Sequence, residues 1–186
     1  MHVPLLVNEF LQRAARLYGD KEAIVDGEIR LTYAEFQARA NQLSHALTGL
    51  GIRKGDRVCI LSPNSHFFLE SFYATSQIGA VLVPLNYRLV AEDHEYILNH
   101  AGVRAVLVDR EYTQIVDSIR TKLTTVEHWI SASQPFHEPA ATGWVDWNTL
   151  IADEPTTLPV PPELEETDLV SINYTSGTTA RPKGVM

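Results

Sequence analysis

Short apolar runs alternate with stretches of helical periodicity through the middle of the chain, and this alternation limits the possible folds more than any other feature. Because the apolar runs have no polar face, strands formed from them need cover on both sides of a sheet. The sequence therefore predicts an α/β fold, with a parallel sheet, helices on both of its faces and right-handed crossovers. Strands are expected over 57–61, 80–83, 104–108 and 126–130, and helices over 64–78, 91–100 and 111–123.

The N-terminal region carries local signals for a helix, a hairpin and a second, longer helix. Apolar residues at helical spacing predict a helix over 5–17, with Leu6, Phe10, Ala14 and Leu17 on its buried stripe. Asp26-Gly27, between two β-prone runs, predicts a hairpin turn at that dipeptide. Thr32 and Glu35 have the spacing of a capping box, so a helix is expected from there to Leu50. Its predicted stripe is Phe36, Ala40, Leu43, Leu47 and Leu50, and Gly51 should end it.

Residues 131–162 interrupt the alternation because they hold six of the ten prolines. We expect a surface excursion here and not a domain boundary, with Trp144 and Trp147 packing a short helical segment onto the body. A last apolar strand is expected over 169–174. The length of 186 residues fits one domain with a real core.

Composition and charge argue against several classes of protein. The net charge of −8 comes with no basic patch, so nucleic acid is not an expected partner. No window reaches 18 consecutive apolar residues and the N-terminus lacks a secretory pattern, so no membrane span and a cytoplasmic location are expected. The single cysteine, Cys59, lies in an apolar run and is expected to be a buried thiol, not a nucleophile.

The stretch 174–185 carries the residue types that bind polyphosphate. Hydroxyls at Thr175, Ser176, Thr178 and Thr179 offer donors, Gly177 and Gly184 allow close backbone approach, and Lys183 adds a positive charge behind Pro182. The stretch directly follows the predicted last strand, and open α/β sheets bind ligands at the carboxyl ends of their strands. Composition alone favours a flexible Ser/Thr/Gly linker. The spacing of a Walker P-loop is absent, as is Gly-x-Gly-x-x-Gly, so a dinucleotide-dependent oxidoreductase is a weak alternative.

The order of these residues closely resembles the signature of the adenylate-forming superfamily, Tyr-Thr-Ser-Gly-Thr-Thr-Gly-x-Pro-Lys-Gly-Val. Eleven of its twelve positions fit, the exception being Ala180 in place of glycine. Residues 31–36 and 55–58 resemble earlier family motifs, and 78–89 resemble the acyl-CoA synthetase branch. The resemblance implies that residues 1–186 are the N-terminal part of that family's large AMP-binding domain, with the remainder absent.

The resemblance implies an activity and a set of site residues. In such enzymes a carboxylic acid attacks the α-phosphate of ATP, and the acyl group then passes from AMP to coenzyme A. Residues 175–183 would hold the β- and γ-phosphates, with Thr175, Ser176, Gly177, Thr178, Thr179, Lys183 and Gly184 as the binding residues. Thr175 matches the hydroxyl that faces Mg²⁺, and Lys183 would offset phosphate charge. No catalytic residue is assigned within this chain.

Two features limit the implied activity. A Cβ at Ala180 would cost about 1 kcal/mol or more if the loop needs a positive φ there. The adenine- and ribose-binding motifs, the acidic Mg²⁺ ligand and the catalytic lysine would lie beyond Met186, so we expect this chain alone not to make acyl-CoA. The alternative is a non-catalytic module with weak polyphosphate binding that acts through a partner chain. An exposed apolar face for docking the remaining portion is expected under either interpretation. The seven histidines show no metal-binding pair.

Overall fold

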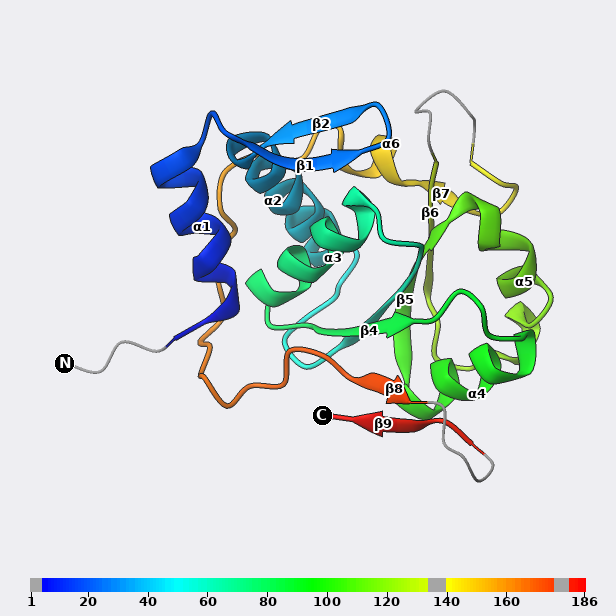
Figure 1. Cartoon of the computed structure of the whole chain (residues 1–186). Helices are drawn as coiled ribbons and strands as arrows, with labels where there is room; N and C mark the ends of the chain where they lie inside the picture. Colours follow the sequence, from blue (N-terminus) through cyan, green and yellow to red (C-terminus); the bar gives the residue numbers. More distant parts are fainter. Residues whose placement is uncertain (1–4, 134–139, 176–180) are drawn as a thin grey trace.

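A five-stranded parallel sheet forms the centre of the computed structural model, which describes residues 5–133, 140–175 and 181–186 (Figure 1). The strand order is β4-β3-β5-β6-β7, and every neighbouring pair is parallel, as predicted. The strands are β3 (Arg57–Leu61), β4 (Val81–Leu85), β5 (Val103–Asp109), β6 (His128–Ala132) and β7 (Val145–Asp146). The order reverses direction between β3 and β5, which is the arrangement of doubly wound folds.

Helices cover both faces of this sheet, which confirms the predicted layers. Along β3, Val58 and Ile60 pack against α2 (Tyr33–Gly49), α3 (His66–Gln77) and α6 (Trp147–Ile151). Cys59 and Leu61 point the other way, into the cluster beneath α4 (Ala91–Ala101) and α5 (Thr113–Asp117). Cys59 is 1% exposed, and burial raises the pKa of its thiol, so it is the inert core residue that the sequence predicts.

Helix α2 begins with the capping box that the sequence predicts. The Thr32 hydroxyl accepts from the Glu35 amide at 3.2 Å, and the Glu35 carboxylate accepts from the Thr32 amide at 2.8 Å. Four of the five predicted stripe residues are buried, and Leu50 is partly buried. Gly51 follows the helix with φ +90°, a conformation that residues with a Cβ rarely adopt.

The predicted stripe of α1 (Val7–Tyr18) is wrong. Phe10 and Leu17 are 56% and 52% exposed, whereas Asn8 and Leu11 face inward. The reason is tertiary: α1 contacts α2 and α3 through a narrow face, and Leu11 joins a small cluster with Ile24 of the hairpin and two α2 residues. Counting apolar residues along the helix did not identify that face.

The hairpin of β1 (Glu22–Asp26) and β2 (Ile29–Thr32) turns one residue later than predicted. Asp26 pairs with Ile29, so the turn residues are Gly27 and Glu28, and Gly27 takes φ +56°. The Asp26 carboxylate is used elsewhere. It accepts from the His66 amide at 2.9 Å and lies 2.7 Å from His66 Nδ1, which connects the hairpin to the start of α3.

The single helix expected over 111–123 is also wrong, because the segment divides into three short pieces. These are the 3₁₀ turn η1 (Arg110–Tyr112), α5 and the 3₁₀ turn η2 (Arg120–Lys122). The Thr113 hydroxyl donates to the Arg110 carbonyl and the Ser118 hydroxyl to the Ile115 carbonyl. Such side-chain bonds to the backbone compete with a continuous helical ladder.

The proline-rich stretch contributes more to the sheet than expected. Within its described residues, β7 adds a fifth strand beside β6, and the Asp146 carboxylate caps α6 by accepting from the Thr149 amide at 2.7 Å. Trp147 is fully buried and Trp144 is 7% exposed, so the predicted packing of a short helix by these residues is confirmed. Among the helices that the structure describes, none is long and apolar enough to cross a bilayer.

Candidate functional site

The segment that leads to residues 174–185 runs along the open edge of β4. The Leu82 amide donates to the Val170 carbonyl at 3.0 Å, and the Ile172 amide donates to the Leu82 carbonyl at 2.9 Å. Only one bridge, Leu82 to Ser171, forms there, so the predicted continuous strand over 169–174 is wrong. The segment still runs parallel to β4, and it therefore leaves the sheet toward the carboxyl ends of the strands, where ligands bind in this class of fold.

A salt bridge and a hydrogen bond to the backbone hold this segment in place before it reaches the sheet. The Lys54 ammonium lies 2.7 Å from the Asp168 carboxylate and donates to the Glu163 carbonyl at 2.7 Å. The pKa of Asp168 is lowered, chiefly by its hydrogen bond from Lys54. Because Lys54 lies in the turn before β3, the sheet itself positions the incoming chain.

A short antiparallel ladder then pairs the residues on either side of 176–182. Its strands are β8 (Asn173–Thr175) and β9 (Lys183–Val185), and Thr175 pairs directly with Lys183. Directly opposed residues place their side chains on the same face of a ladder, with Cβ atoms about 5 Å apart. The structure thus brings together two of the predicted binding residues, a hydroxyl and an ammonium group.

Both of these side chains are exposed and available for binding. Within the described part of the chain, neither the Thr175 hydroxyl nor the Lys183 ammonium has a hydrogen bond or ion pair. By contrast, Lys54 and Lys122 are paired with carboxylates at 2.7 and 3.0 Å. An unpaired cation next to a free hydroxyl is an arrangement that suits an anionic ligand.

The third described member of the predicted site, Gly184, faces Tyr174 across the ladder. A Cβ on Gly184 would lie 3.2 Å from Tyr174 Cζ and 3.0 Å from Ile172 Cγ2. The glycine therefore makes room for the tyrosine ring, which is a packing role that the sequence did not indicate. Ser176, Gly177, Thr178 and Thr179, together with Ala180, lie outside the described residues, so their roles remain predictions.

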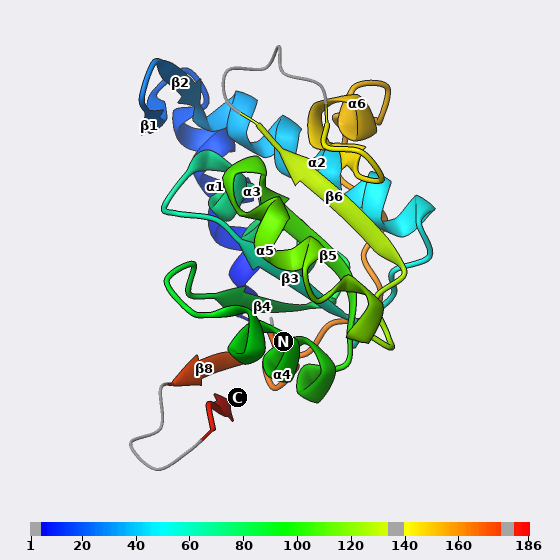
Figure 2. The same ribbon diagram turned by 90° about the vertical axis from the view of Figure 1, so that its right-hand side faces the viewer.

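Sequence reasoning missed the neighbours of this loop on α4. His100 Nδ1 is 2.7 Å from the Tyr174 hydroxyl, and the Arg181 guanidinium lies 5.2 Å from the centre of the Tyr96 ring. Burial, followed by the nearby Tyr96, raises the pKa of Tyr174. No local pattern could reveal these contacts, because α4 lies more than 70 residues earlier in the chain. Figures 1 and 2 both place β8 beside α4, at the end of the molecule opposite the β1–β2 hairpin.

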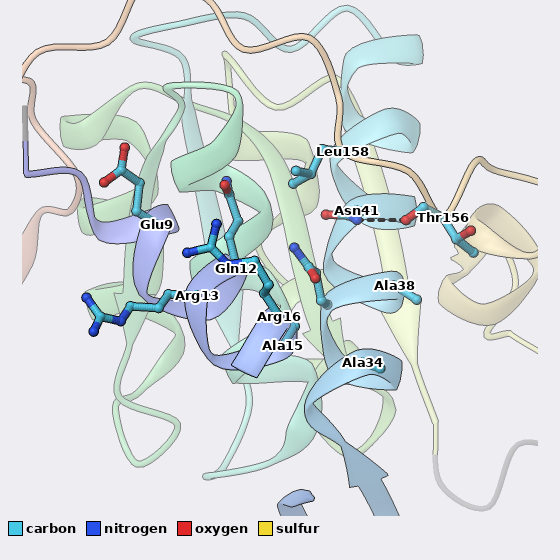
Figure 3. Close-up of a pocket in the computed structure, with 11 residues that line it drawn as sticks. Glu9, Gln12, Arg13, Ala15, Arg16, Ala34, Ala38, Asn41, Thr156 and Leu158 are labelled. Atoms are coloured by element: carbon cyan, nitrogen blue, oxygen red, sulfur yellow. Dashed lines mark hydrogen bonds between the residues drawn. The ribbon is translucent and has the colours of Figure 1, made fainter. Parts of the chain in front are cut away.

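Two hollows bear on where a ligand could bind. One, of about 690 Å³, lies beside the loop between α4 and residues 181–182, and Glu92, Asp93 and Glu95 give it an acidic rim. The other, of about 740 Å³, lies between α1, α2 and Thr156 and Leu158, and none of the predicted site residues lines it (Figure 3). In that second groove Asn41 donates to the Thr156 carbonyl at 2.7 Å, a contact that fastens the proline-rich stretch to α2 (Figure 3).

The comparison with known proteins agrees with the geometry of the loop. The family model described as AMP-binding enzyme matches residues 11–186, nearly the whole chain. The chain belongs to the AMP-binding enzyme family. This confirms the family resemblance of residues 174–185. The homologues of this chain are acyl-CoA ligases.

Individual relatives of this AMP-binding family member act on different acids. A long-chain-fatty-acid–CoA ligase of Thermus thermophilus is 38% identical over 182 residues, covering 96% of this chain and 32% of the ligase. A 3-methylmercaptopropionyl-CoA ligase of Ruegeria lacuscaerulensis is 36% identical over 193 residues, covering 100% of this chain and 35% of that protein. The crystal structure of the anthranilate CoA ligase AuaEII with anthranoyl-AMP matches with a TM-score of 0.92 and 31% identity, over 100% of this chain and 35% of AuaEII.

The chain spans about a third of the length of the relatives that it matches. Within the residues that the structure describes, no three His, Cys, Asp or Glu side chains are grouped as a metal site would require.

Proposed function

We propose that this chain supplies the polyphosphate-binding loop of an ATP-dependent, AMP-forming acyl-CoA synthetase. The observation that carries the proposal is the pairing of Thr175 with Lys183 at the mouth of residues 176–182. Both side chains are exposed on one face of the ladder, and neither has a partner in the described part of the chain. Three of the similar proteins named above are CoA ligases, which supports the reaction class.

The reaction has two steps. An oxygen of the carboxylate attacks the α-phosphorus of ATP, the bond to the bridging oxygen breaks, and pyrophosphate leaves with that electron pair. The thiol sulfur of coenzyme A then attacks the acyl carbon, which releases AMP and forms the thioester. Catalysis of phosphoryl chemistry depends chiefly on positioning and charge neutralisation. In this scheme the chain's own residues, Thr175 to Lys183, bind and orient the β- and γ-phosphates that become pyrophosphate.

Lys183 has the clearest role because its charge has no competing partner within the described residues. An ammonium group is a compact point charge that can approach any phosphate oxygen, and contact with the leaving pyrophosphate would stabilise its developing charge. The antiparallel ladder holds the lysine backbone across from Thr175. The predicted hydroxyl and amide donors of Ser176, Gly177, Thr178 and Thr179 would complete the binding of phosphate oxygens.

A magnesium ion fits this site as part of a complex with the nucleotide. Mg²⁺ in such sites takes one or two protein ligands and fills the rest of its octahedron with phosphate oxygens and water. The Thr175 hydroxyl has the right chemistry for one ligand, and the described residues offer no cluster of carboxylates. Bound there, the ion would neutralise phosphate charge.

The identity of the acid and the full activity require residues outside this chain. The relatives' names include a long-chain fatty acid, 3-methylmercaptopropionate and anthranilate, so the family accommodates very different acids. We propose that a further portion docks beside the β8–β9 ladder, where Val185 is 53% exposed and strand edges are open. This chain by itself is then expected not to make acyl-CoA. Production of acyl-CoA by the purified chain would contradict that expectation.

Calorimetry with pyrophosphate tests the proposed function. Lys183→Ala should weaken binding of pyrophosphate about 10- to 100-fold, because a charged hydrogen bond is worth about 1.5–3 kcal/mol. The matched control is Lys21→Ala, which removes an exposed lysine from the hairpin region, where it lies over the Tyr18 ring. Absence of binding by the unaltered chain, or equal weakening by both substitutions, would overturn the proposal.

The alternative is a non-catalytic module that keeps the fold and acts through a partner chain. The two interpretations differ in a mixing experiment with a separately produced C-terminal portion of a related ligase. Restored ATP–pyrophosphate exchange in the presence of a carboxylic acid favours the synthetase. Stable association without any exchange activity favours the module.

A further inference from the structure

One face of α4 contacts both ends of the candidate phosphate loop. Tyr96 and His100 are four residues apart, so their side chains are neighbours on that helix, and their ring centres lie 5.3 Å apart. His100 is hydrogen-bonded to the Tyr174 hydroxyl at 2.7 Å, and the two rings meet edge to face with centres 5.8 Å apart. Tyr174 lies immediately before Thr175, at the entry to the loop.

The exit from the loop rests on the same helix. The Arg181 guanidinium lies 5.2 Å from the centre of the Tyr96 ring, within the range of a cation–π contact. Arg181 lies two residues before Lys183 in the sequence. Tyr174 and Arg181, which lie on the two sides of the loop, therefore contact two neighbouring side chains on the same face of α4.

The ladder between β8 and β9 needs such support. Each strand has three residues, and an isolated two-stranded ladder of this length is at best marginally stable in water. Gly184 contributes indirectly, because the space above it accommodates the Tyr174 ring, whose hydroxyl reaches His100. Because α4 is itself packed on the sheet, contacts to α4 restrict the motion of the ladder.

We propose that Tyr96 and His100 are positioning residues that hold the two ends of the phosphate loop against α4. The proposal deepens the function proposed above and rests on it for its consequence in binding. A loop whose ends are held before the ligand arrives loses less conformational freedom on binding, so its affinity for phosphate is higher. Neither side chain needs to touch the phosphates for this effect.

Amide hydrogen exchange of β8 and β9 tests whether α4 holds the loop. His100→Ala should speed exchange at 173–175 and 183–185 about 2- to 10-fold, the range expected for one lost hydrogen bond. Alanine is the best helix former, so weakening of α4 cannot explain that result. His100→Asn keeps a polar atom near the position of Nδ1 and should restore much of the protection.

The matched control is His45→Ala. His45 is likewise a helical histidine with a hydrogen-bonded ring, since its Nε2 lies 2.9 Å from the Thr157 carbonyl, but it belongs to α2. Its replacement should leave exchange in β8 and β9 unchanged. Unchanged exchange in His100→Ala, or an equal effect of His45→Ala, would overturn the proposal.

Pyrophosphate binding then separates this inference from the proposed function. If the unaltered chain binds pyrophosphate, His100→Ala should weaken binding, by at most the factor of its effect on exchange. Equal affinity in the two proteins would refute a positioning role. If the unaltered chain binds no pyrophosphate, the proposed function fails, and the exchange measurement still decides whether α4 holds the loop.

Discussion

Substituting Gly184 by alanine tests the geometry of the candidate site at its tightest point. The added Cβ would lie 3.0 Å from Ile172 Cγ2, 3.2 Å from Tyr174 Cζ and 3.4 Å from the Tyr174 hydroxyl oxygen. Favourable carbon–carbon contacts are about 3.5–4.0 Å, so the neighbours must move by roughly half an ångström. The glycine backbone is not in the left-handed region, so backbone strain does not contribute.

The cost of the substitution follows from what the neighbours can do. Overpacking in a closed core costs about 1–3 kcal/mol, and the ladder is exposed on one side, so the lower end of about 1 kcal/mol applies. Moving the Tyr174 ring also strains its hydrogen bond to His100. A loss of about 1 kcal/mol opens the ladder roughly fivefold more often. Pyrophosphate affinity should also fall, by at most the same factor, because only the closed ladder is competent to bind and its population falls.

Hydrogen exchange of the β8–β9 amides and calorimetry with pyrophosphate measure these two quantities. The control is Gly49→Ala near the end of α2, where no atom would lie within 4 Å of the added Cβ and φ is not positive. That change should raise global stability by about 0.5–1 kcal/mol and leave the ladder alone. Unchanged exchange and unchanged affinity in Gly184→Ala would show that the contact between Gly184 and Tyr174 does not shape the site.

Two further predictions concern buried ionisable side chains. The Glu70 carboxylate is fully buried, with Arg39 Nε 2.6 Å from its Oε1 and Nη2 3.2 Å from its Oε2, so Arg39→Met should cost about 3–5 kcal/mol in urea unfolding. The double variant with Glu70→Leu should recover most of that loss, and a lack of recovery would contradict the assignment. Burial lowers the pKa of His94 below its ordinary 6.5, with Asp93 only partly opposing it, so the unfolded chain binds the proton more readily. The unfolding free energy should therefore fall as the pH drops below about 6.5, by at most about 1.4 kcal/mol per pH unit, and His94→Leu should reduce that slope.

Elements with strong local signals were predictable from the sequence. The capping box of Thr32 and Glu35 begins α2, and Gly51 and Gly102 follow α2 and α4 with positive φ. The apolar strands identified the parallel sheet, because strands without a polar face must be covered on both sides. Each of these features depends only on residues nearby in the sequence or on the apolar surroundings that a central strand requires.

The errors occur where tertiary contacts override such signals. Which face of α1 is buried depends on where the hairpin and α2 lie, so Leu11 packs inward while Phe10 stays exposed. The segment after Glu163 follows β4 because Lys54 and Leu82 bind it, and it forms one bridge where a strand was expected. At the site, the motif indicated Thr175 and Lys183, but nothing near them in the sequence indicated His100.

The acidic charge of the chain explains why these long-range contacts matter for binding a polyanion. With a net charge of −8, the protein as a whole repels phosphate, and Glu92, Asp93 and Glu95 lie close to the loop. At physiological salt the Debye length is about 8 Å, so distant charges are largely screened and the few cations at the loop decide the outcome. Short-range attraction of this kind depends steeply on distance, so Lys183 is effective only if the backbone that carries it is held still. A three-residue ladder is only marginally stable by itself, and the sheet edge and α4 are the described elements positioned to hold it.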